Sequence, residues 1–151
     1  MTDLAKARRK AREWTLQFLF SIDVENSSLD ELKNIALDRF WNMMEASEEA
    51  EEIRKYPKSK NDAIKKINGI FANAAVIDEK IVKAANNWTL DRMAVVDRNI
   101  IRLGAYEILF CDEIPPKVSI NEAVEMAKEF ADKDSTKFIN GVLDRIKREA
   151  E

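Results

Sequence analysis

Hydrophobic side chains recur at steps of three and four residues along most of the chain, and this spacing is typical of amphipathic helices. Residues 3–24 form the first such segment. Its apolar stripe is composed of Leu4, Ala7, Ala11, Trp14, Phe18 and Ile22. Its opposite face mixes cations with apolar groups, namely Arg9, Arg12, Leu16 and Phe20. Two interpretations of Leu16 and Phe20 stay open: they pack under a second layer of helices, or they are exposed beside the cations.

The hydrophobic pattern in the middle of the chain predicts further helices, which are separated by a polar segment. A helix over residues 29–46 begins after Ser28, which is spaced from Glu31 as in a capping box. Its predicted stripe is Leu32, Ile35, Ala36, Arg39, Phe40 and Met43. Residues 45–61 are acidic and then rich in lysine, and Pro57 predicts a frayed helix end and a loop there. Residues 62–87 return to a helical pattern, as two helices with a break near residues 75–76.

The last third of the chain predicts three helices. Residues 95–111 are the most apolar segment, which favours the centre of a bundle. Gly104 costs about 1 kcal/mol inside a helix, and a close helix crossing is the usual compensation. Ser119 and Glu122 form a second capping box that opens the next helix, and Asp134 is expected to be the N-cap of the last one. Residues 1–151 are therefore expected to be one all-α domain, a compact bundle of six or seven helices.

Composition removes several classes of chemistry. The chain has no histidine and a single cysteine, so we expect no Ser-His-Asp or Cys-His catalysis, no Cys/His zinc site and no internal disulfide. Three glycines and three prolines are too few for a sandwich or a barrel. No apolar run of 18 residues and no signal peptide are recognisable. We expect a cytoplasmic protein without a cofactor, a metal or a membrane anchor.

Charge is distributed unevenly along the chain. Residues 1–12 carry a net charge of +4, and the other 139 residues carry −7. Such asymmetry suggests a basic face that meets an anionic partner. A solvated first helix turn explains the same pattern, so charge alone leaves both interpretations open.

Four blocks of sequence resemble the NusB family of bacterial transcription antitermination factors. They are residues 7–13 with 17–20, residues 96–107, residues 114–124, and residues 134–135 with 137–144. The blocks lie in the order found in the family and reach from residue 7 to residue 144. The resemblance implies an all-helical fold of two small helical subdomains.

The resemblance also implies a function of binding and assembly rather than catalysis. Members of the family bind the boxA element of nascent ribosomal RNA transcripts. They do so together with NusE, which is also a small-subunit ribosomal protein, and the complex acts on elongating RNA polymerase. No catalytic residue is therefore expected, which agrees with the composition.

The candidate RNA-binding residues combine cations with aromatic rings, as the recognition of single-stranded RNA requires. They are Lys6, Arg8, Arg9, Lys10, Arg12, Phe20, Lys137 and Phe138. Phe20 stands where the family commonly has tyrosine, so the ring is kept and a hydroxyl is lost. Lys137 and Phe138 follow from the family's last motif.

Two aspartates have structural and functional interpretations. Asp97 is the candidate contact for NusE; alternatively it is a charge at a helix N-terminus or a partner of Arg98 or Arg102. Asp134 is expected to be a structural cap first, and to affect an RNA surface through the order that it imposes on Phe138.

The sequence suggests three classes of function. The leading hypothesis is an RNA-binding antitermination subunit, and the second is a protein-interaction adaptor of the same fold without RNA binding. Similar helical domains precede RNA methyltransferase domains, but such an enzyme needs a longer chain with a glycine-rich cofactor loop. The pattern leaves monomer and homodimer open.

Overall fold

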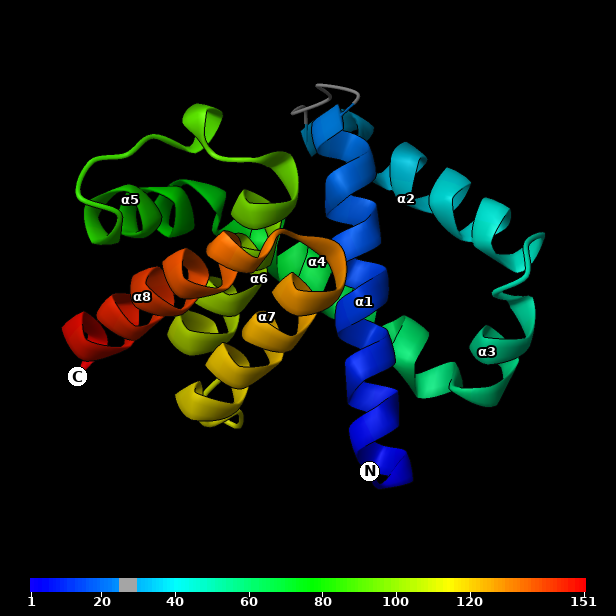
Figure 1. Ribbon diagram of the computed structural model, residues 1–151. Helices are drawn as coiled ribbons and strands as arrows, with labels where there is room; N and C mark the ends of the chain where they lie inside the picture. The colour runs from blue at the N-terminus through cyan, green and yellow to red at the C-terminus, as the bar shows by residue number, and fades with distance from the viewer. Residues whose placement is uncertain (25–29) are drawn as a thin grey trace. The chain divides into compact units, whose positions relative to one another are not determined.

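The computed structural model describes residues 1–24 and 30–151, and the described residues are helical, with no strand among them (Figure 1). The α-helices are α1 (Asp3–Val24), α2 (Asp30–Glu45), α3 (Ala50–Lys55), α4 (Pro57–Ala72), α5 (Ala74–Ala84), α6 (Val95–Phe110), α7 (Pro116–Phe130) and α8 (Lys133–Ala150), and the short 3₁₀ helix η1 spans Leu90–Arg92. The chain divides into unit 1, Met1–Asn68, and unit 2, Gly69–Glu151. The predicted all-α class with two helical subdomains is confirmed, but the described residues form eight α-helices rather than the six or seven expected, because α3 lies in a segment predicted as a loop.

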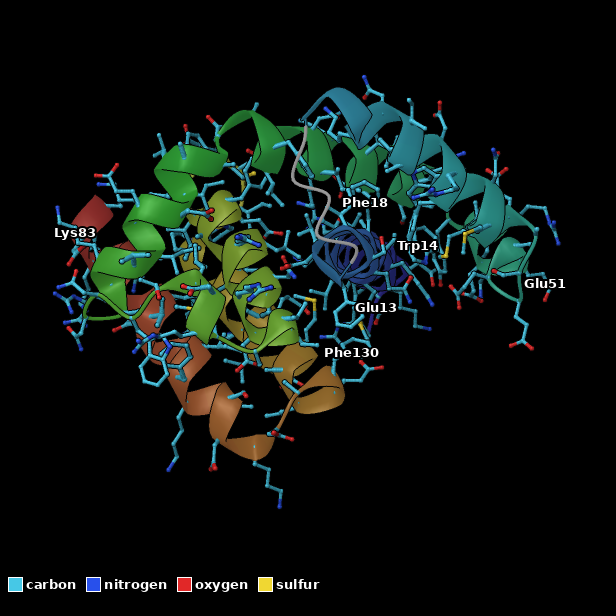
Figure 2. The ribbon with its side chains drawn as sticks, turned by 90° about the horizontal axis from the view of Figure 1, so that it is seen from above. Glu13, Trp14, Phe18, Glu51, Lys83 and Phe130 are labelled. Atoms are coloured by element: carbon cyan, nitrogen blue, oxygen red, sulfur yellow. The ribbon has the colours of Figure 1, made fainter. Side chains whose placement is uncertain are left out.

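Unit 1 has an aromatic core between α1 and α2. The Trp14 and Trp41 rings meet edge to face with centroids 5.8 Å apart, and Phe18 meets Phe40 in the same way at 5.5 Å. Figure 2 shows Trp14 and Phe18 leaving α1 on the side of α2. The predicted stripe of α1 holds from Ala11 onward, whereas Leu4 in the first turn is exposed.

The buried face of α2 differs from the predicted one. Leu37 and Trp41 are buried, while Ile35 and Met43 are exposed. Trp41 contacts both Trp14 and Phe40 edge to face, and burial of this large ring decides which side of α2 turns inward. The capping box predicted at Ser28 lies outside the described residues.

The segment predicted as a loop, residues 45–61, contains helix α3 and the start of α4. Pro57 is the first residue of α4 and not a terminator, because a proline at that position lacks only an N–H that would have no partner in the helix. The buried Ser59 donates a hydrogen bond from Oγ to the Ala7 carbonyl at 2.6 Å, which ties α4 to α1. The predicted break near residues 75–76 lies at Asn73 instead, where Nδ2 donates to the Gly69 carbonyl.

Unit 2 is organised around α6, which packs against α5, α7 and α8. Ile100, Ile101 and Leu103 are fully or almost fully buried, so the central position predicted for this helix is confirmed. A Cβ added at Gly104 would lie 2.7 Å from Leu143 Cδ1 of α8. Gly104 therefore allows the predicted close crossing of two helices.

Two predicted caps in unit 2 are wrong. Helix α7 begins at Pro116, and the buried Ser119 donates from Oγ to Glu107 Oε1 at 2.8 Å instead of capping a helix. Helix α8 begins at Lys133 with Asp132 in the N-cap position, so Asp134 lies within the first turn. A carboxylate in that turn still interacts favourably with the helix dipole. In the described part of the chain, no helix combines the length and apolar character that crossing a membrane requires.

Candidate nucleic-acid interface

The N-terminal half of α1 presents cations to solvent, and an aromatic ring follows toward the C-terminal end of the helix. Lys6 and Arg8 are exposed, and Arg9 is half-buried. Phe20 is 41% exposed, whereas Leu16, one turn earlier, is buried. Of the two interpretations, packing therefore holds for Leu16 and exposure for Phe20. Arg8 and Phe20 are separated by about 18 Å along the helix axis, so they can contact different nucleotides of one strand.

Arg12 does not belong to this exposed set. Only 4% of the residue is exposed, and it takes part in interactions within the protein. A buried guanidinium requires such partners because desolvation of an unpaired charge is costly. The helical period predicted the side of α1 on which Arg12 lies, but the neighbouring elements cover that position.

Lys10 lies among carboxylates. Its Nζ is 3.8 Å from Glu13, 3.7 Å from Glu49 and 3.8 Å from Glu52, with Lys10 itself about one-quarter exposed. Glu49 also accepts a hydrogen bond from Trp14 Nε1 at 3.1 Å, which fixes the acidic start of α3 against α1. The positive charge of Lys10 is therefore compensated within unit 1.

In unit 2, the exposed Lys137 and the half-buried Phe138 lie on α8. The Phe138 ring is 6.2 Å from that of Trp88, at an interplanar angle of 56°. Trp88 is 54% exposed, whereas its place in the sequence predicts only a junction between helices. The available signal was a tryptophan in the polar run of residues 86–89, where no apolar stripe accounts for it.

Asp97 connects the first turns of α6 and α8. Its Oδ2 accepts a hydrogen bond from Ser135 Oγ at 2.8 Å, and the residue is 9% exposed. Arg98 instead donates to the carbonyls of Leu90 and Met93, and Arg102 Nε lies 3.1 Å from Asp78. Asp97 thus holds the start of the helix that carries Lys137 and Phe138, while Asp134 is exposed.

Each unit therefore presents one set of the predicted residues. Lys6, Arg8, Arg9 and Phe20 lie on α1 of unit 1, whereas Lys137 and Phe138 lie beside Trp88 in unit 2. No group of three histidine, cysteine or carboxylate side chains placed to hold a metal ion occurs among residues 1–24 and 30–151. The groups displayed are cations and aromatic rings, which suit the backbone and bases of single-stranded RNA.

Comparison with known proteins relates both units to one family. The model of the NusB family matches residues 9–148. The transcription antitermination protein NusB of Bacillus licheniformis is 44% identical over 144 residues, covering 95% of this chain and 98% of that protein. The protein of the same name from Bacillus subtilis (strain 168) is 41% identical and covers 95% of this chain and 97% of its own.

Solved structures agree with this relationship. The structure of T. maritima NusB has a TM-score of 0.76 at 37% identity, with 94% of this chain and 91% of that chain covered. A crystal structure of the antitermination factors NusB and NusE in complex with double-stranded RNA contains a chain with a TM-score of 0.74 at 26% identity, covering 95% and 98%. The match of the family model over nearly the whole chain, together with relatives more than 40% identical, shows that this chain belongs to the NusB family.

Proposed function

We propose that this protein is a subunit of a transcription antitermination complex. It binds boxA-type single-stranded RNA of nascent ribosomal RNA transcripts together with NusE, and the assembly acts on elongating RNA polymerase. Family membership supports this proposal, as does the likeness to a NusB chain crystallised with NusE and RNA. The observation that carries the RNA-binding part is the display of exposed cations and an exposed aromatic ring on α1.

The residues of α1 make two kinds of contact with RNA. Lys6, Arg8 and Arg9 contact phosphates, and Phe20 stacks on a base, which contributes about 1–3 kcal/mol. Lys137 supplies a further phosphate contact in unit 2, and Phe138 a further ring. With about four phosphate contacts, the logarithm of the binding constant should fall with the logarithm of salt concentration at a slope near −3.

The proposed contacts differ in part from the full set of candidates. Lys10 is compensated by three carboxylates and Arg12 is buried, so both contribute mainly to the structure of unit 1. Asp97 acts as a positioning residue through Ser135 rather than as a contact for NusE. Asp134 stabilises the first turn of α8 and so supports the placement of Phe138.

Titration of labelled boxA RNA with the protein, with and without NusE, tests the proposal. We expect binding that strengthens when NusE is added and weakens as salt rises. The variant Arg8→Ala/Arg9→Ala should bind more weakly by about tenfold or more, because two phosphate contacts are lost. Lys80→Ala/Lys83→Ala, on α5 of unit 2, removes the same charge from exposed positions and is the matched control.

Three results would contradict the proposal. They are an absence of RNA binding in both titrations, binding that does not depend on salt, and equal binding by the two double variants. The second candidate function, a protein-interaction adaptor without RNA contact, is favoured by the ion pairs of Lys10 and the burial of Arg12. That function predicts that charge reversal at Lys6, Arg8 and Arg9 leaves NusE binding and antitermination unchanged.

A further inference from the structure

An open hollow lies beside the exposed indole of Trp88 in unit 2. Its volume is about 480 Å³, and it is lined by Asn86, Asn87, Trp88, Thr89, Asp91 and Arg92. We call these six residues the Trp88 hollow. A volume of this size falls within the range of about 300–1,000 Å³ that is typical of sites for small ligands.

The backbone of the Trp88 hollow is held in place by several hydrogen bonds. Asn86 and Asn87 have positive φ angles of 54° and 65°, a conformation that asparagine tolerates better than most residues. The N–H of Asn87 donates to the Val82 carbonyl at 2.8 Å, and Arg145 Nη1 of α8 donates to Asn86 Oδ1 at 2.5 Å. The turn therefore presents Trp88 from a fixed position rather than from a loose loop.

The chemistry of the lining suits one nucleotide. Trp88 is 54% exposed, more than any other aromatic residue in the described part of the chain, so its indole is accessible to a base. The lining also offers the amide of Asn87, which can pair with the edge of a base. The Thr89 side chain hydrogen-bonds to the Asp91 carboxylate and lowers the pKa of Asp91, so this pair forms a fixed polar wall of the hollow. Arg92, which is exposed, supplies the cation that a phosphate requires.

We propose that the Trp88 hollow binds one unstacked base of single-stranded RNA, with Trp88 as the stacking surface and Arg92 against a phosphate. This inference rests on the proposed function and extends it, because it adds a stacking position to unit 2. A protein ligand fits less well, since the lining is mainly polar and contains no aliphatic side chain. The Phe138 ring, 6.2 Å from that of Trp88, extends the aromatic surface onto α8.

The test compares variants of the full chain in binding to fluorescently labelled boxA RNA. Trp88→Leu should weaken binding about 5- to 150-fold, which is the measured range for loss of one stacked base. Trp88→Phe keeps an aromatic face and should bind within about threefold of the original protein. Arg92→Gln should reduce the magnitude of the salt slope by about 0.7, the value for one phosphate on a single strand. The matched control is Phe130→Leu, which removes a similarly exposed ring from α7 of the same unit.

A second measurement reports on Trp88 directly. Trp14 and Trp41 are 1% and 5% exposed, so RNA that stacks on an indole should quench the emission of Trp88. The variant Trp88→Phe should therefore keep its affinity for RNA, but the addition of RNA should no longer quench tryptophan emission.

Three outcomes would overturn the proposal. In the first, Trp88→Leu binds RNA as tightly as Phe130→Leu, while Arg8→Ala/Arg9→Ala still binds RNA more weakly than the original protein. This result leaves the proposed function intact. In the second, Trp88→Leu loses NusE binding but not RNA binding, which assigns the hollow to a protein partner. In the third, the original protein binds no RNA with or without NusE, which also removes the proposed function.

Discussion

We predict that the acidic residues paired with Lys10 lower the affinity of the protein for RNA. Glu49 and Glu52 lie 3.7 and 3.8 Å from the ammonium group, and these ion pairs compete with any phosphate that Lys10 could contact under the proposed function. The double variant Glu49→Gln/Glu52→Gln removes both charges. The glutamine at position 49 keeps an oxygen that can accept the hydrogen bond from Trp14 Nε1, so the fold of unit 1 is preserved.

The size of the effect follows from the exposure of these groups. The side chains of Glu49 and Glu52 are 37% and 36% exposed, so solvent screens each pair. Ion pairs of this kind contribute about 0.2–1 kcal/mol each. Release of Lys10 from two such pairs should strengthen RNA binding about 2- to 30-fold at low salt, because about 1.4 kcal/mol corresponds to a factor of ten. The salt slope should also become steeper by about 0.7 if Lys10 gains one phosphate.

Fluorescence anisotropy with boxA RNA at several salt concentrations measures both quantities. The control is Glu48→Gln/Glu51→Gln, which makes the same change in net charge at exposed positions that pair with no cation among the described residues. Figure 2 shows Glu51 pointing away from α1. Equal gains in the two double variants would show that overall charge, and not the contact with Lys10, governs affinity. Lys10→Ala should abolish the gain in the Glu49→Gln/Glu52→Gln background, and a gain that survives would refute the reasoning.

Three further predictions concern stability. Gly69→Ala should lower the melting temperature because its Cβ would collide with the Tyr106 ring, whereas Gly141→Ala, with open space, should stabilise by about 0.5–1 kcal/mol; shifts of the same sign would contradict this. Burial raises the pKa of Tyr106 from 10.0 to about 12, which favours the neutral phenol in the folded state. The free energy of unfolding should therefore fall as pH rises from 10 to 12, and Tyr106→Phe should reduce this fall in urea titrations; an equal fall would argue against it. Ser119→Ala removes a donor from the buried Glu107 and should cost about 1–3 kcal/mol in thermal unfolding, and an unchanged melting temperature would be the opposing result.

The sequence predicts the buried face of a helix well where burial follows the helical repeat within that helix. The stripe through Ala11, Trp14 and Phe18 and the central position of α6 follow from the helical repeat, because burial of one face is what keeps an amphipathic helix in place. Caps and helix ends were predicted less well. Ser119 has the residue type and spacing of a cap, but the buried carboxylate of Glu107 competes for its hydroxyl. Pro57 stops a helix only if the helix begins before it, and α4 begins at this residue.

The candidate site was also predicted best where a property depends on one helix alone, and less well where it depends on how helices pack together. The exposed cations Lys6 and Arg8 were identified from helix position and charge, since these are properties of α1 alone. The helical period left the exposure of Phe20 open, because burial at that position depends on other helices. The burial of Arg12 was not, because it depends on which elements cover that side of α1. Trp88 was missed as a surface group, since its exposure and its contact with Phe138, 50 positions later in the chain, depend on how the helices pack.

The sequence by itself determined that the chain is helical, which face of most helices is buried, and which family it belongs to. These properties depend on residues a few positions apart or on the order of motifs. The tertiary structure decided which charged and aromatic groups are available to a ligand. Lys10 meets Glu49, and Asp97 meets Ser135, only after helices distant in sequence have packed together. Hydrogen bonds and ion pairs between such positions depend on side-chain placement to within about an ångström, which a helical repeat does not specify.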